Sequence, residues 1–419
     1  MKKSAFLLSM AALILVPMII SLNSCKKDDD NEEQDAPLPE NYYIMEKEFM
    51  NTEDPCFVNV MFQVVNGYGK GISNLTTENF TVYEDNQAVS PTESALSIMK
   101  KDAVPYQLRT LLMIDNSVSV GSNLADIKKA AKSFVKNIES KQKIAVYVFS
   151  ENTQIIQEFT SDTVKLNAAI DGIQLGLAST DLYGAIITGV SKWTDVYSDD
   201  NIEQGYMVLF TDGRDTQGSH TLNEALTARG KKQVFSLGLG AEIDPNALQQ
   251  IGNAGYFKIE NIEDLSAKFI DVQEDIRNLA NSFYYLYYMS PKRGDKVHTL
   301  RLNIKGNANG SENGYITGQF NSQGFYSMTQ TLMINHGQSQ VVLTVLDSYT
   351  LSAVTFLPNN TPQFSWTTSD ASVVTIQPQG GDNANAVITG VGQDGQTAII
   401  TCNDEANSLT TTISVVLED

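Results

Sequence analysis

The sequence is poor in the residues that most often carry enzymatic or metal chemistry. It has three histidines and three cysteines in 419 residues, and His220, His298 and His336 show no metal-ligand spacing such as His-x-x-x-His. The sequence also has no Gly-x-Ser-x-Gly nucleophile elbow and no Walker-type phosphate loop. These absences argue against zinc-dependent, serine-hydrolase and nucleotide-driven chemistry, and we expect the protein not to be an enzyme.

Basic residues are also scarce. The chain has 29 Lys and Arg against 49 Asp and Glu, which gives a formal net charge of −20 at pH 7. Such a charge repels phosphate and an anionic bilayer surface, so we expect no nucleic acid partner. A hydrophobic content of 42% is that of a globular protein, and 419 residues predict two or three domains.

The N-terminus reads as an export signal. Two lysines precede an apolar stretch over residues 5–20, which is shorter than a membrane span. The segment Leu22-Asn23-Ser24-Cys25 resembles the lipobox of bacterial lipoproteins, and this resemblance implies that Cys25 carries lipid. A plain signal peptide is the alternative. The charged run over residues 26–33 is a solvated tether, and it resembles the surface-export signal of Bacteroidetes lipoproteins. We expect a lipid-anchored outer-membrane protein exposed at the cell surface, with a periplasm-facing anchor as the alternative.

Apolar runs alternate with helix-period segments in the middle of the chain. Strands separated by helices indicate βαβ units, whose right-handed crossovers place helices on both faces of a sheet. The predicted fold is α/β, with a doubly wound, mostly parallel, Rossmann-like sheet. The expected strands are residues 108–114, 143–150, 206–212, 233–240 and 256–259, and the expected helices are residues 124–138, 166–173, 182–193, 221–229, 245–251 and 262–279.

Oxygen-bearing side chains follow two of these strands. Asp115, Ser117 and Ser119 come directly after one apolar run, and Asp212 ends another. Thr180 stands just before a helical pattern. The carboxyl ends of parallel strands are where α/β sheets build sites, and hard cations take oxygen ligands. The sequence therefore predicts one divalent metal at these five residues, with Mg²⁺ expected and Ca²⁺ or Mn²⁺ as alternatives.

The pattern Asp-x-Ser-x-Ser, Thr, Asp resembles the metal-ion-dependent adhesion site of von Willebrand factor A domains. This resemblance implies that an acidic side chain of a protein ligand completes the metal shell. Together with the expected lipid at Cys25, it implies a lipid-anchored, adhesin-like binding protein of the cell envelope. The alternative is a structural scaffold or accessory subunit of a cell-envelope or fimbrial complex. Asn116 departs from the commonest family pattern at a position that points away from the metal.

The flanking regions are β-rich. The tyrosine-rich segment over residues 283–289 is either a sugar-binding platform or a packed strand. The last 90 residues read as a β-sandwich and resemble bacterial immunoglobulin-like group 2 domains. Cys56 and Cys402 form either an interdomain disulfide or two separate buried thiols. The expected divisions are 1–25 (signal peptide with lipobox), 26–41 (acidic tether), 42–104 (β-rich lead-in), 105–282 (A domain), 283–330 (β-rich extension) and 331–419 (immunoglobulin-like β-sandwich).

Overall fold

The computed structural model describes residues 38–91, 93–100, 106–139, 141–198, 201–327, 329–337 and 339–418. The expected signal peptide, the lipobox with Cys25 and most of the acidic tether lie outside the described residues. Among the described helices, none combines the length and the apolar character needed to cross a bilayer.

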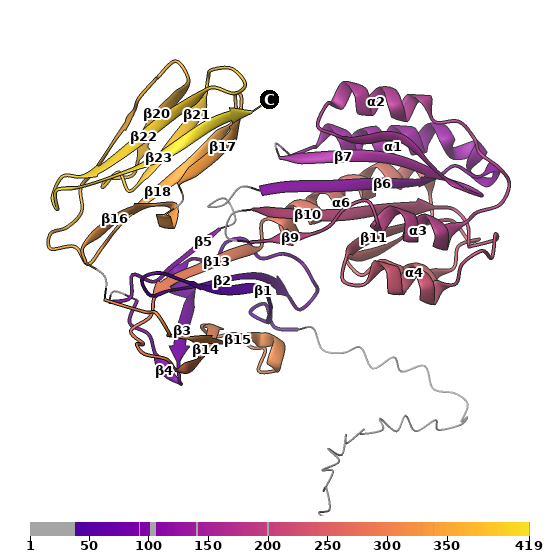
Figure 1. The fold of residues 1–419 in the computed structure, drawn as a ribbon. Helices are drawn as coiled ribbons and strands as arrows, with labels where there is room; N and C mark the ends of the chain where they lie inside the picture. Colours follow the sequence, from indigo (N-terminus) through magenta and orange to yellow (C-terminus); the bar gives the residue numbers. More distant parts are fainter. Residues whose placement is uncertain are drawn as a thin grey trace, which may run out of the picture. The chain divides into compact units, whose positions relative to one another are not determined.

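The middle of the chain forms a seven-stranded, mostly parallel sheet (Figure 1). The strand order is β12-β11-β10-β6-β7-β8, and the short β9 pairs with β10. The four pairings from β12 to β7 are parallel, whereas β8 and β9 pair antiparallel. This confirms the expected sheet. Its strands are β6 (Tyr106–Asp115), β7 (Gln142–Phe149), β8 (Thr153–Thr160), β9 (Val196–Tyr197), β10 (Ile202–Thr211), β11 (Gln233–Leu239) and β12 (Gly255–Ile259).

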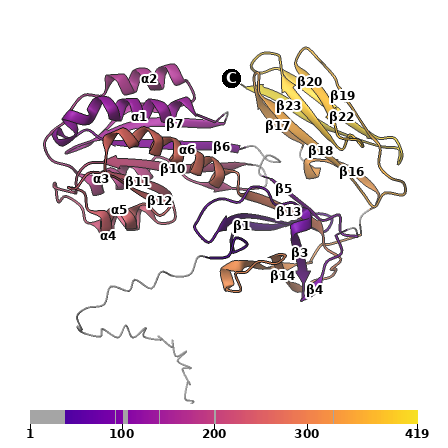
Figure 2. The same ribbon diagram turned by 180° about the vertical axis from the view of Figure 1, so that it is seen from behind.

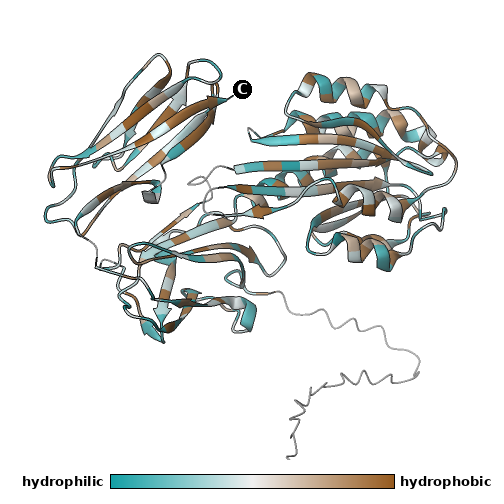
Figure 3. Ribbon diagram, viewed as in Figure 1, coloured by the Kyte–Doolittle hydropathy of each residue, from teal (hydrophilic) through white to brown (hydrophobic). Residues whose placement is uncertain are grey.

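Helices cover both faces of this sheet (Figures 1 and 2). One apolar core holds α1, α2 and α6 against one face, and a second core holds α3, α4 and α5 against the other. Apolar and polar residues alternate along α1 at helical spacing, so that one stripe is buried (Figure 3). The helices are α1 (Leu124–Lys136), α2 (Thr163–Gly172), α3 (Leu182–Val190), α4 (Leu222–Arg229), α5 (Pro245–Ile251) and α6 (Leu265–Ala280).

Strand β8 is an element that the sequence did not reveal. It lies at the sheet edge, where most of its residues are half-buried or exposed, so it lacks the continuous apolar run of a central parallel strand. Only three residues separate it from β7, and this short connection requires an antiparallel pair.

The regions before and after the α/β sheet form one β unit. Strand β13 follows α6 and pairs with both β2 and β5, while β14 pairs with β3. The segments expected as a lead-in and an extension therefore share two sheets, β1-β2-β13-β5 and β15-β14-β3-β4, and one core. The strands are β1 (Tyr43–Glu53), β2 (Phe57–Asn66), β3 (Phe80–Glu84), β4 (Gln87–Ala88), β5 (Ser97–Lys100), β13 (Phe283–Met289), β14 (Val297–Ile304) and β15 (Tyr315–Asn321).

The tyrosine-rich segment is β13, and all seven of its residues are buried. Tyr284 donates a hydrogen bond to the Ile72 carbonyl at 2.8 Å, and Tyr288 donates to Glu84 at 2.8 Å. The packed-strand alternative is confirmed, and the sugar-binding platform was wrong, because the ring faces are not open to a ligand.

The C-terminal region is a β-sandwich of two four-stranded sheets around one core, as expected. Cys402 lies in that core, and Cys56 is buried in the β unit; both are free, which confirms the alternative of two separate thiols. Burial raises the pKa of Cys402 to about 12. The strands are β16 (Thr331–Ile334), β17 (Gln340–Thr344), β18 (Ser348–Phe356), β19 (Phe364–Thr368), β20 (Val374–Gln379), β21 (Asn385–Gly390), β22 (Thr397–Asp404) and β23 (Leu409–Glu418).

Candidate metal centre

The carboxyl ends of two neighbouring strands bring four of the five predicted ligands together. Strands β6 and β10 are parallel, with Ile114 opposite Phe210, so Asp115 and Asp212 emerge at the same sheet edge. Ser117 follows Asp115 and is the N-cap of a short 3-10 helix over Val118–Asn123, and Ser119 lies in the first turn of that helix. The parallel register of β6 and β10 therefore places these side chains at one edge of the sheet, as the positions of the two apolar runs predicted.

Hydrogen bonds connect these side chains into one network. The backbone N–H of Ser117 donates to Asp115 Oδ1 at 2.8 Å. The Ser117 and Ser119 hydroxyl oxygens lie 3.0 Å apart, and Ser119 Oγ donates to Asp212 Oδ1 at 2.8 Å. Asp115 and Ser117 are fully buried, whereas Ser119 is exposed, so the network runs from the interior to the surface.

Thr180, the fifth predicted ligand, lies on the loop that precedes α3. The Gly176 N–H donates to the Asn116 carbonyl at 2.7 Å, and the Val118 N–H donates to the Leu177 carbonyl at 3.2 Å. These bonds fasten the loop that precedes Thr180 to the Asp-x-Ser-x-Ser turn. Thr180 itself is buried, and its backbone N–H donates to the Thr216 hydroxyl at 2.8 Å on the loop after Asp212.

The close approach of the two loops requires glycine at position 176. A Cβ atom there would lie 2.5 Å from Ser150 Oγ and 3.0 Å from both polar side-chain atoms of Asn116. Ser150 also accepts a hydrogen bond from the Asp181 N–H through its carbonyl, at 2.7 Å. Gly176 thus allows the end of β7 and both loops to meet.

Burial dominates the electrostatics of the two carboxyl groups. It raises the pKa of Asp115, against the opposing hydrogen bonds from Ser117 and Thr211. Burial also raises the pKa of Asp212, against the hydrogen bond from Ser119. Both shifts mean that the charged carboxylates are poorly solvated, and a bound cation would relieve this.

The donor set fits a hard divalent cation. It comprises two carboxylates and three hydroxyls, all oxygen donors, and one of the carboxylates is fully buried. Within the described ranges no three or more His, Cys, Asp or Glu side chains group as a metal-binding cluster. The candidate site has only two such side chains among its five oxygen donors, so it would not form a cluster of this kind. The finding gives no support to a thiolate or imidazole zinc site among the described residues.

Two further acids near the site have structural partners. Asp181 accepts from the Gly184 N–H at 3.1 Å and begins α3. Asp215 accepts from the N–H groups of Tyr183 at 3.3 Å and Gly218 at 2.9 Å. Each carboxylate is engaged in holding a loop or a helix start, which leaves it poorly placed to act as a general base.

The β unit contains an Asp-His-Ser chain that resembles a catalytic triad only in its connectivity. His298 Nδ1 lies 2.8 Å from Asp85 Oδ2, and its Nε2 lies 3.1 Å from Ser322 Oγ. The Ser322 hydroxyl donates to the Gly294 carbonyl at 2.5 Å, so it accepts from the histidine. Ser322 is also fully buried. An activated nucleophile must give its proton to the histidine and reach its substrate, and this serine does neither.

Thr211 is a site residue that sequence reasoning missed. Its hydroxyl donates to Asp115 Oδ2 at 2.6 Å, and Thr211 is fully buried. The signal was present, since a hydroxyl directly precedes Asp212 at the end of β10. The role of this hydroxyl was not predicted, because a threonine inside a buried strand is equally compatible with packing.

Comparison with known proteins finds a family match over the same part of the chain. The von Willebrand factor type A domain family matches residues 110–214. Among solved structures, a von Willebrand factor type A protein from Catenulispora acidiphila is 11% identical, with a TM-score of 0.37 over 67% of this chain and 73% of that one. The tip protein Mfa5 of the type V pili of Porphyromonas gingivalis has a von Willebrand factor domain that is 12% identical, with a TM-score of 0.33 over 42% and 96%.

A third similar structure is proximal thread matrix protein 1 from the mussel byssus, described as having a zinc-occupied MIDAS motif. It is 17% identical, with a TM-score of 0.36 over 47% of this chain and 50% of that one, so this chain spans about half of its length. TM-scores this low support no conclusion about the ligands or partners of this chain. The family match and the sheet topology together show that this chain contains a von Willebrand factor type A domain.

Proposed function

We propose that the protein is a lipid-anchored, adhesin-like binding protein of the cell envelope. Its A domain engages a protein ligand through a divalent cation, with Mg²⁺ favoured, held by Asp115, Ser117, Ser119, Thr180 and Asp212. The observation that carries the proposal is the hydrogen-bonded convergence of two carboxylates and two serine hydroxyls at the ends of β6 and β10.

The chemistry of the donors defines the ligand. A bound divalent cation supplies a Lewis-acidic position that can accept one more oxygen ligand. Three of the five protein donors are neutral hydroxyls, so when these bind the cation directly and the two aspartates act through water, the cation keeps much of its charge. An acidic side chain of the partner is the group that best matches such a site, through a charge-assisted contact. Ser119, exposed at the outer end of the network, lies where that partner would arrive.

We further propose that the protein is not an enzyme. The acids beside the site cap loops and a helix, and the Asp85-His298-Ser322 chain lacks an available nucleophile. The site thus offers binding groups without a general base, which is the chemistry of recognition rather than of turnover.

Calorimetry with Mg²⁺ tests the metal assignment. The purified chain should bind one divalent ion, and Asp115→Ala should abolish that binding. Ser119→Ala provides a milder variant, because its side chain is exposed and its loss should weaken binding without threatening the fold. Asp171→Ala, which removes an exposed carboxylate that pairs with Lys132, is the matched control and should bind as the parent does. Unchanged binding in Asp115→Ala would contradict the assignment.

Two experiments on cells test the anchor and the exposed location. Cys25→Ser should release the protein from the membrane fraction, because the predicted lipid attachment is lost. Protease treatment of intact cells should remove the A domain if the protein is a surface adhesin. Protection of the A domain would instead favour the alternative of a scaffold or accessory subunit within an envelope complex.

A further inference from the structure

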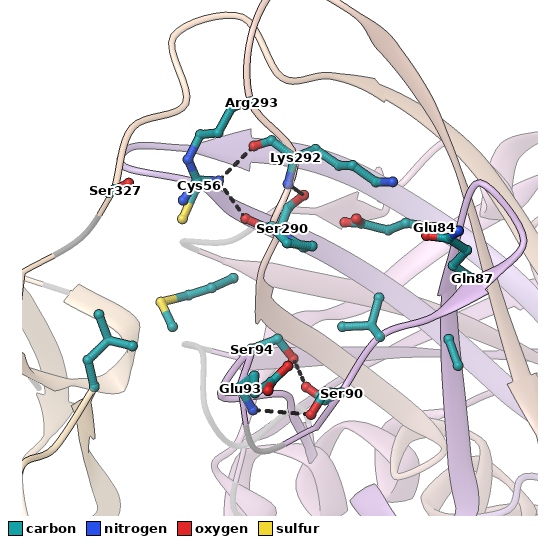
Figure 4. A pocket seen from close by; sticks show the side chains of 15 residues that line it. Cys56, Glu84, Gln87, Ser90, Glu93, Ser94, Ser290, Lys292, Arg293 and Ser327 are labelled. Carbon is teal, nitrogen blue, oxygen red and sulfur yellow. Dashed lines mark hydrogen bonds between the residues drawn. The ribbon is translucent and has the colours of Figure 1, made fainter.

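The β unit contains a cavity that shares no residue with the metal centre (Figure 4). Its volume is about 380 Å³, and it is lined mainly by the β3–β4 hairpin, by Val89, Ser90, Glu93 and Ser94, and by the segment over residues 289–293, with Cys56, Ser327 and Leu357 completing the wall. A volume of this size falls within the range of sites for small molecules. What the cavity can bind depends on which of its polar groups lack partners.

Glu84 lines this cavity, and one of its carboxylate oxygens lacks a hydrogen-bond partner within the described part of the chain. Its side chain is 1% exposed, and Tyr288 donates one hydrogen bond to Oε1 at 2.8 Å. Oε2 is buried and has no hydrogen-bond partner among the described residues. A carboxylate is an acceptor with two oxygens, and a buried oxygen without a donor costs about 1–3 kcal/mol. A ligand bound in the cavity would supply a hydrogen-bond donor to this carboxylate oxygen.

The turn beside Glu84 fixes where its carboxylate lies. Asp85 and Asn86 take φ values of 50° and 65°, and they form the two-residue connection between β3 and β4. Glu84 is paired with Gln87 across this hairpin and with Leu300 on β14. Because strands flank it on both sides, the carboxylate is held in place before any ligand arrives.

The cationic side chains of the cavity have other partners. Lys292 Nζ lies 3.0 Å from Asp85 Oδ2. Arg293 Nη1 donates to the carbonyls of Ser290 at 2.8 Å and Lys292 at 2.7 Å. Lys292 is thus compensated by Asp85, and Arg293 is turned toward the backbone, so no ion pair among the described residues compensates the buried Glu84; Glu93 also lines the cavity, but it is exposed to solvent.

The walls of the cavity suit a short hydrocarbon chain. Val89 and Met289 contribute apolar surface, and both side chains are at least nine-tenths buried. Figure 4 shows Glu84 and Ser290 on one side of the cavity, and Ser90 and Glu93 on the opposite side. From Glu84 and these walls we infer that the cavity binds a small aliphatic primary amine, whose ammonium group donates to Glu84 Oε2.

A charged ammonium is favoured over a hydroxyl for two reasons. An ammonium approaches the carboxylate with a full positive charge and three N–H donors, whereas a hydroxyl offers one neutral donor. An ammonium also neutralises the buried carboxylate, whereas an alcohol leaves its charge in place. The same cavity should therefore discriminate between two ligands of equal size that differ only in their polar end.

Butylamine and butan-1-ol are such a pair. We expect butylamine to bind the purified chain with a dissociation constant of about 1–10 mM, since it has five non-hydrogen atoms. Butan-1-ol should bind at least about tenfold more weakly. The methyl resonance of Met289 in carbon-labelled protein reports whether the amine occupies this cavity, and its shift should be the same with and without a chelator.

The variants Glu84→Gln and Glu93→Gln form a matched comparison. Both remove one negative charge at the cavity, but only Glu84 is buried, and Glu93 is exposed. Glu84→Gln should weaken butylamine binding by at least about tenfold, and Glu93→Gln should leave it unchanged. If Glu84→Gln does not fold, the amine-against-alcohol comparison on the parent chain decides. Equal Met289 shifts with the amine and the alcohol, no shift with the amine, or equal loss in both variants would overturn the proposal.

Discussion

Removing the hydroxyl of Thr211 should destabilise the candidate metal centre, because this hydroxyl donates a hydrogen bond to Asp115. The Thr211→Val change keeps the shape of a side chain that is fully buried, but it takes the donor away from Asp115 Oδ2, which lies 2.6 Å from Thr211 Oγ1. Hydrogen bonds to charged groups contribute about 1.5–3 kcal/mol, and the buried carboxylate oxygen would be left without that donor. We expect the A domain to lose about 2 kcal/mol of unfolding free energy in the presence of a chelator.

The same change should weaken metal binding. Residues that orient a metal ligand typically change affinity by about 10–100-fold when they are removed, and Thr211 orients Asp115 in this way. Calorimetry on Thr211→Val should therefore show weaker Mg²⁺ binding at an unchanged stoichiometry of one. Thr211→Ser keeps the hydroxyl and should retain most of the affinity.

The chain offers a clean optical signal for the unfolding measurement. It has two tryptophans, Trp193 in the A domain and Trp366 in the sandwich, both buried. A Trp366→Phe background leaves Trp193 to report urea unfolding of the A domain alone. If Thr211→Val unfolds and binds Mg²⁺ as the parent does, the Thr211–Asp115 bond does not position the ligand and the reasoning fails.

Three further predictions concern stability. Gly205→Ala should cost about 1–3 kcal/mol, because a Cβ there would overlap the Trp193 indole, whereas Gly172→Ala has open space and should be neutral in the same urea titration. Burial, aided by the charge of Glu46, raises the pKa of Glu48 from 4.5 to about 7. The folded state therefore binds this proton more tightly than the unfolded state does, and the protein loses stability as the pH rises from 4.5 to 7. Glu48→Gln should flatten that slope and gain about 1–3 kcal/mol above pH 7, and a parent-like pH profile would contradict it. Gln273→Leu should destabilise α6 by about 1–3 kcal/mol by removing buried amide bonds, including one of 2.6 Å to Gln142, and urea unfolding identical to that of the parent would contradict this.

The α/β sheet, and the convergence of Asp115 and Asp212 at one edge of it, could be predicted from the sequence because both leave local signals. Buried parallel strands such as β6 and β10 are continuous apolar runs, and polar side chains at their ends stand out against them. The parallel register then brings Asp115 and Asp212 together without further information. The hydroxyl of Thr211 could not be assigned in this way, because its role depends on a neighbour 96 positions away.

The joining of the β-rich flanks into one unit was beyond sequence reasoning for the same reason. Strand β2 pairs with β13 at positions such as Val60 and Leu286, which lie on opposite sides of the whole A domain in the chain. Propensity and alternation identify such strands but not their partners, because pairing depends on long-range packing. The role of Glu84 in the proposed amine site depends in the same way on long-range pairing, because β3 is joined to β14.

The insertion of the A domain between β5 and β13 has a mechanical consequence. These two strands pair directly, with Tyr284 opposite Lys100 and Tyr287 opposite Ser97, so the entry and exit of the A domain are clamped side by side. A pull applied to the two ends of the chain passes across the hydrogen bonds of this sheet before it reaches the α/β sheet. The pairs that β13 makes with β2 and β5 must separate before tension reaches the A domain, so these pairs shield the candidate metal centre from a pull on the chain ends.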